Sequence, residues 1–297
     1  LSRHVSYLNL FYKISMFDML ELLKILVLLA FASLYAYFDV FNKRNIPDKF
    51  VYLSIAVGIV FTLLNPVRII IFSFLIAIFI GAAGYLLYKA GLLGLGDGLE
   101  FTFISLMLPI QPKPILGIPQ FGLPFVLSVF ISSGIATVII IPLYYILKEK
   151  KLEINTKSAE RAALVFASYM LLLLLIYFLF GVRRIATLLI LIVAFFSTLL
   201  FMVENTINKE MVRWVYPTEI EEGDIIAIGL LSERDLRLLR AKFKNFGKLA
   251  SKRSIAELKD LKKRLPVYKN AVPFSLFILA GIVLSLIIGD LLLLIFL

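Results

Sequence analysis

The chain has 297 residues, of which 61% are hydrophobic and only 17% are charged, and its mean hydropathy is +0.97. Soluble domains are nearer to half apolar and a quarter charged. Apolar runs of roughly 18 residues or more, long enough to cross a bilayer, recur from Leu20 to Leu297. The composition predicts a polytopic membrane protein and excludes a soluble enzyme, a disordered chain and a disulfide-bonded scaffold.

The residue types exclude several kinds of catalytic site. There is no cysteine, and the single histidine, His4, lies in the N-terminal tail. A thiol nucleophile, a Ser-His pair and a zinc site built from Cys or His are therefore absent. We expect neither a metal nor a cofactor, so any chemistry must come from carboxylates, Lys/Arg, hydroxyls or the backbone.

Apolar runs between charged or Pro/Gly-containing breaks predict the transmembrane helices in chain order. Eight candidates follow, of which the fourth is short, near residues 17–38, 50–64, 67–90, 99–110, 121–147, 162–180, 185–203 and 271–297. Residues 1–15 precede the first of them, and we treat them as a tail without functional weight.

The basic residues cluster on one side of this arrangement. Of the 31 Lys/Arg, 24 fall in four segments that alternate loops place on the same side: 40–49, 87–98, 148–161 and 204–270. By the positive-inside rule this side is cytoplasmic, both termini face outward, and the pair Arg183 and Arg184 is the main exception. The net charge of +11 then reflects membrane orientation, so we expect membrane lipid and no nucleic acid as a partner.

Residues 204–270 form the one large polar block, with 15 Lys/Arg against 10 Asp/Glu. Turn residues and β-branched residues within 216–230 predict short strands. Ser232, followed three residues later by an acid, predicts the start of a helix, and a second helix is expected over about 254–265. The basic face of this block is suited to anionic lipid.

The predicted fold class is an all-α polytopic membrane protein of about eight transmembrane helices, with a small α+β cytoplasmic domain inserted before the last helix. The expected division is an N-terminal tail (1–15), a catalytic transmembrane core (16–147), an additional helix pair (148–203), the cytoplasmic basic domain (204–270) and a C-terminal transmembrane helix (271–297).

Four acidic residues lie at or within the hydrophobic segments: Asp39, Asp97, Glu100 and Asp290. Ionisable groups at membrane depth are costly and are functional candidates by default. Asp39 ends the first span and Asp97 begins the fourth, so both fall at the cytoplasmic boundary. Two carboxylates brought together there would share a proton, one acting as base toward water and the other donating to a carbonyl, as in aspartic proteases. The alternative is that each carboxylate only caps a helix end.

Glycines surround Asp97, at Gly91, Gly94, Gly96 and Gly98. Their bare backbone permits close helix approach and lets an extended substrate lie against the chain. The pattern G-x-G-D at a membrane boundary, with a second intramembrane Asp, therefore favours a catalytic pair over two isolated caps.

The chain resembles the GxGD membrane aspartic proteases, and within them the archaeal preflagellin peptidase branch of the type IV prepilin peptidases. The resemblance covers roughly residues 17–147 and 271–297. It rests on Asp39 followed by the turn Arg44, Asn45, Ile46 and Pro47, on Gly94 to Gly98 around Asp97, and on the last span ending at Asp290.

The resemblance implies an archaeal plasma-membrane enzyme with Asp39 and Asp97 as the catalytic pair. Such enzymes remove the short basic leader from pilin- or archaellin-like precursors at the cytoplasmic face. The sequence departs from the family where a Lys often stands two residues after the motif Asp. Here Leu99 and then Glu100 follow, so Glu100 is a candidate contact for a basic leader residue, or else an acid favoured by a helix N-terminus.

Two further features bear on the branch of the family and on the role of Asp290. The zinc-binding Cys motif of many bacterial relatives is missing, which argues against the bacterial type with its methyltransferase activity. Asp290 lies a membrane thickness from the pair, so a structural role at a helix end is expected for it.

Two other functions remain as alternatives. A secondary transporter could use Asp39 and Asp97 as a proton or cation site, although it should show internal repeats and acids near the midplane, and neither is evident. A non-catalytic assembly protein could recruit a partner through its basic domain, but the presence of both aspartates in their motifs counts against it.

Overall fold

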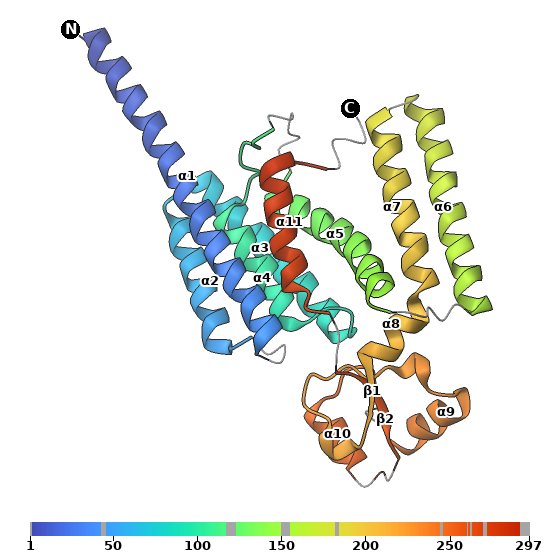
Figure 1. Ribbon diagram of the computed structural model, residues 1–297. Coiled ribbons are helices and arrows are strands. Elements are labelled where there is room, and N and C mark those ends of the chain that lie inside the picture. The colour runs from blue at the N-terminus through green and yellow to red at the C-terminus, as the bar shows by residue number, and fades with distance from the viewer. Residues whose placement is uncertain are drawn as a thin grey trace. The chain divides into compact units, whose positions relative to one another are not determined.

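The computed structural model describes residues 2–42, 46–116, 123–149, 155–181, 184–243, 246–259, 261, 263–269 and 272–291 (Figure 1). Helices dominate, and the chain divides into two compact units. The first unit contains the described residues of 1–84, 95–136 and 273–297, and the second those of 85–94 and 137–272.

Six helices contribute to the first unit: α1 (Ser2–Phe41), α2 (Asp48–Leu63), α3 (Val67–Lys89), α4 (Leu95–Met107), α5 (Phe125–Lys148) and α11 (Ser275–Ile288). Of these, α3 and α5 belong to it only up to Gly84 and Ala136. Residues 2–15, expected as a tail, are helical and continue into the first predicted span.

The short helix α4 is the most enclosed element of this unit. Its side chains Phe101, Phe103, Ile104 and Met107 are all buried in a core shared with α1, α2, α5 and α11. A hydroxyl fixes it to α2, since Thr62 Oγ1 donates to the Leu106 carbonyl at 2.7 Å. The segment that carries Asp97 is thus held on several sides by other helices.

Among the described residues, four helices are long and apolar enough to cross a membrane: Met19–Phe41, Val67–Lys89, Phe125–Lys148 and Thr156–Leu179. A fifth is formed if Ala186–Met202 and Glu204–Met211, bent by 59° at their junction, are one span. The expected number of eight is not confirmed, because α2, α4 and α11 have only 16, 13 and 14 residues, fewer than the about 20 that a membrane crossing needs.

The second unit contains an apolar helix pair, α6 (Thr156–Phe180) and α7 (Arg184–Met202), followed by α8 (Glu204–Met211). Beyond α8 lies a small α+β fold with its own core. Strand β1 (Val212–Val215) pairs antiparallel with β2 (Leu265–Tyr268), accompanied by α9 (Glu233–Lys242) and α10 (Lys252–Leu258). Two single 3-10 turns, Pro217–Glu219 and Ile228–Leu230, complete the fold.

The local predictions for this polar block are partly confirmed. Ser232 caps α9, its hydroxyl accepting from the Asp235 N–H at 3.1 Å. The strands, however, flank the predicted segment 216–230, within which only isolated bridges occur at Ile225 and Ile226. The helix expected over 254–265 spans Lys252–Leu258 instead, and Leu265 lies in β2, where the following Pro266 favours extended backbone.

Candidate active site

Three of the four acids that the sequence places in or beside hydrophobic segments lie near one another in the first unit. Asp39 is close to the C-terminal end of α1, Asp97 is in the first turn of α4, and Glu100 follows one turn later. Asp39 is 7% exposed and Glu100 1%, whereas Asp97 is half-buried. Electrostatic interactions link Glu100 to both aspartates. The site is therefore a cluster of carboxyl groups largely removed from solvent.

One residue contacts both aspartates. The backbone N–H of Ser275 donates to Asp39 Oδ2 at 3.0 Å, and the Ser275 hydroxyl lies in donating geometry 3.3 Å from Asp97 Oδ1. Ser275 is fully buried and is the first residue of α11. Residues 236 positions apart in the chain thus meet where α1, α4 and α11 converge.

Sequence reasoning did not single out Ser275. The available signal was the neighbouring Pro273 in the segment A-V-P-F-S-L, just before the last apolar run. A backbone N–H has no side-chain signature, so the contact to Asp39 could be found only from the fold.

The ends of two helices shape the electrostatics of the aspartates. Asp39 accepts a backbone N–H at the N-terminus of α11, where the helix dipole favours negative charge. Asp97 lies within the first turn of its own helix, α4, in the same kind of field. Both positions therefore help a buried carboxylate to hold charge in a site of low polarity.

Glu100 has a different environment from the two aspartates. Both carboxyl oxygens are buried, and neither makes a hydrogen bond of good geometry within the described part of the chain, although the Ser275 hydroxyl is close enough to interact with this carboxyl. Because an unpartnered buried charge is strongly unfavourable, this side chain is suited to carrying a proton or to receiving a donor from a bound molecule.

The glycines of the motif allow close contacts at the start of α4. A Cβ built at Gly98 would lie 3.1 Å from the Cα of Gly84 on α3, so the two helix backbones touch there. A Cβ at Gly96 would lie 2.8 Å from Ile46 Cδ1, so the Ile46 side chain packs against the start of α4. Gly94 immediately precedes α4, and Pro47 precedes α2. Arg44 lies outside the described residues.

Asp290 is placed apart from the carboxyl cluster. It lies 15 positions beyond Ser275, just after the end of α11, and its carboxylate is buried and accepts from the Ser128 hydroxyl of α5. No group of three or more His, Cys, Asp or Glu side chains that could hold a metal ion occurs within the described residues.

The comparisons with known proteins agree with the motif. Residues 26–141, less than half of the 297-residue chain, match the model of the type IV leader peptidase family. This range contains Asp39, Asp97 and Glu100 but ends before Ser275. Searches of curated proteins and of solved structures gave no match. Over residues 26–141 the chain is therefore similar to the type IV leader peptidase family.

Proposed function

We propose that the protein is a membrane-embedded aspartic endopeptidase that removes the short basic leader from prepilin- or preflagellin-like precursors. The match of residues 26–141 to the type IV leader peptidase family supports a peptidase that processes prepilin-type leaders. In this proposal Asp39 and Asp97 are the catalytic pair. The main support for this pair is that Ser275 contacts both aspartates. Two carboxyl groups that are far apart in the sequence therefore lie in one site.

The proposed chemistry is general acid and base catalysis by two carboxyl groups. Asp39, held by the Ser275 N–H at a helix N-terminus, is the better placed to carry negative charge and to take a proton from the attacking water. Asp97 then donates a proton to the oxygen of the scissile carbonyl. Ser275 acts as a positioning residue that holds the two carboxyl groups at a fixed place relative to each other.

The positions around the pair have supporting roles in this proposal. The close contacts at Gly96 and Gly98 allow α4 to bring Asp97 toward α1, Ile46 packs against the start of α4, and Pro47 directly precedes α2. Arg44 belongs to the same motif. Glu100 is the candidate partner of a basic leader residue, which would have to reach it between the helices because its carboxyl is buried.

We further propose that the site faces the cytoplasm of an archaeal cell. The clustering of 24 of the 31 Lys/Arg in one set of loops supports this orientation. The proposed division of the chain is a catalytic core of residues 16–147 with the last helix, an additional helix pair of residues 148–203 and a basic domain of residues 204–270.

A cleavage assay tests the function directly. The protein, purified in detergent, is incubated with full-length precursors that carry a basic leader before a hydrophobic segment. The expected result is a single cut at the junction between leader and hydrophobic segment, located by mass spectrometry of both products. Failure to cut any such precursor would count against the peptidase assignment.

The role of Ser275 leads to a specific prediction. Ser275→Ala keeps the backbone N–H but removes the hydroxyl that faces Asp97, so kcat should fall about tenfold, the loss expected for one hydrogen bond of about 1.4 kcal/mol. KM should stay within about twofold, because the hydroxyl positions a catalytic group and does not bind the leader.

Ser285→Ala is the matched control for this prediction. Ser285 is also fully buried on α11, but its hydroxyl lies 3.0 Å from Ser132 Oγ and not at the carboxyl cluster. A general loss of helix packing would lower the activity of both variants. Equal kcat values for Ser275→Ala and Ser285→Ala would remove Ser275 from the proposed site.

The orientation can be measured by labelling, since the chain contains no cysteine. A cysteine replacing the exposed Lys157 should be shielded from an impermeant thiol reagent added to intact cells. One replacing the exposed Lys113 should react. Strong labelling at position 157 from outside would invert the topology and place the carboxyl cluster on the face opposite to the leader.

A further inference from the structure

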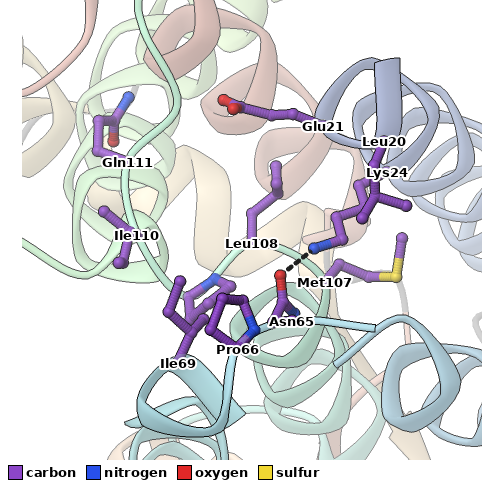
Figure 2. A pocket seen from close by; sticks show the side chains of 11 residues that line it. Leu20, Glu21, Lys24, Asn65, Pro66, Ile69, Met107, Leu108, Ile110 and Gln111 are labelled. Carbon is purple, nitrogen blue, oxygen red and sulfur yellow. Dashed lines mark hydrogen bonds between the residues drawn. The ribbon is translucent and has the colours of Figure 1, made fainter. Parts of the chain in front are cut away.

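A pocket lies at the end of the first unit that is remote from the carboxyl cluster. Its cavity has a volume of about 250 Å³ (Figure 2). Lys24 is one of its lining residues and lies 15 positions before Asp39 on α1, about 22 Å along the helix. The pocket is lined by Leu20, Glu21, Lys24, Asn65, Pro66, Ile69, Met107, Leu108, Pro109, Ile110 and Gln111.

Lys24 gives this pocket a buried positive charge. The residue is only 5% exposed, and its ammonium donates to Asn65 Oδ1 at 2.5 Å (Figure 2). The Asn65 amide is fixed in turn, because its NH₂ group donates to the carbonyls of Phe61 and Thr62. Among the ion pairs of the described residues, none involves Lys24. Buried charges are normally paired, so this ammonium is suited to an anion.

Gln111 gives the same pocket a free hydrogen-bond acceptor. Its side-chain NH₂ donates to the Ser285 carbonyl at 2.9 Å, which fixes the orientation of the amide. Its Oε1 is buried and has no partner among the residues that the structure describes. A hydroxyl or amino group of a bound molecule would satisfy it.

The volume of the pocket and its position along the first helix limit the class of ligand that it can bind. The cavity is smaller than the about 300 Å³ at which pockets for drug-sized molecules begin, so it suits a compact polar group better than a peptide segment. Apolar side chains such as Leu20, Ile69 and Ile110 surround the polar atoms. The pocket also lies toward the N-terminal end of Met19–Phe41, a helix that can cross a membrane, and thus at the depth of lipid headgroups.

We propose that this pocket binds the phosphodiester headgroup of a phospholipid whose headgroup also carries a hydroxyl or amino donor. The Lys24 ammonium binds the phosphate, and Gln111 Oε1 accepts from the donor. Glu21, exposed at the rim one turn before Lys24, is the other charged group that faces the pocket and weakens anion binding. The site is independent of the proposed peptidase activity.

Native mass spectrometry of the delipidated protein in detergent tests the proposal. The protein is titrated separately with phosphatidylglycerol, phosphatidylcholine and free glycerol phosphate. Phosphatidylglycerol should bind more tightly than phosphatidylcholine, which has the same phosphate but no donor in its headgroup. Binding of glycerol phosphate as tight as that of the lipid, or equal binding of the two lipids, would overturn the proposal.

Single-residue variants test whether Lys24 is responsible for phosphatidylglycerol binding. Lys24→Met, which suits the apolar walls, should weaken phosphatidylglycerol binding about tenfold or more, the loss expected for one charge-assisted hydrogen bond. Arg68→Gln is the matched control, since Arg68 is an exposed cation at the start of neighbouring α3 and does not line the pocket. An equal loss in both variants would show nonspecific charge attraction and reject the site.

A third variant keeps the test decisive if Lys24→Met does not fold. Glu21→Gln changes an exposed side chain at the rim of the pocket and removes its negative charge. It should tighten phosphatidylglycerol binding about threefold, as expected for removing a like charge that is itself exposed to solvent. Unchanged or weaker binding in Glu21→Gln would contradict the proposal.

Discussion

Asp39→Asn and Asp97→Asn should each abolish precursor cleavage while leaving a folded, membrane-inserted protein. An amide cannot take a proton from water as a carboxylate does, and it cannot give one to the carbonyl as a carboxylic acid does. General acid and base catalysis contributes typically 10²- to 10⁴-fold, so each variant should lose at least about a hundredfold in rate. Asn keeps the acceptor oxygen that the Ser275 N–H contacts, so the fold should survive at position 39.

The measurement is the initial rate of leader removal at equal amounts of folded protein, with thermal unfolding in detergent as the check on folding. Two other aspartates serve as controls. Asp48→Asn changes an exposed acid in the first turn of α2, and Asp290→Asn changes a buried one outside the cluster. Both should cleave at near-normal rates. Near-normal turnover in either Asp39→Asn or Asp97→Asn would disprove the pair.

The sequence was sufficient to propose the aspartates but not their shared partner. Asp39 and Asp97 stand out because charge is rare in apolar segments and because glycines flank Asp97. Ser275 is one hydroxyl residue near the last apolar run, and its main contact uses the backbone N–H. Which helix end meets which carboxylate depends on the packing of α1, α4 and α11, and hydrophobic periodicity does not encode that pairing.

The position of helix α4 could be predicted from the sequence, but its burial by other helices could not. The apolar run near 99–110 was recognised as a short span, and the structure places the helix at Leu95–Met107. Composition alone did not show that α4 would be enclosed by protein rather than by lipid. In the polar block, the cap at Ser232 was readable because capping is local, whereas the pairing of β1 with β2 joins Val212 to Tyr268 across the whole domain.

The second large effect is expected at Gly98, next to Asp97. A Cβ at this position would lie 3.1 Å from Gly84 Cα, and a Cβ at Gly84 would lie 2.9 Å from Gly98 Cα. Both contacts are with backbone, which cannot rotate away as a side chain can. Gly98→Val should therefore push α4 from α3, which costs about 1–3 kcal/mol for overpacking. Because Asp97 moves with the helix, the rate should fall about a hundredfold, the loss typical of a misplacement near 1 Å.

A graded series separates this steric effect from a change in helix propensity. Gly134→Val introduces the same residue into helix α5, where a Cβ would meet no atom within 4 Å, so it should cleave normally. Gly96→Val should fall between the two, because its Cβ would meet the end of the flexible Ile46 side chain at 2.8 Å. Initial rates and unfolding temperatures of the three variants are the measurement. If Gly98→Val matched Gly134→Val in both, the close approach of α3 and α4 would not be what positions Asp97.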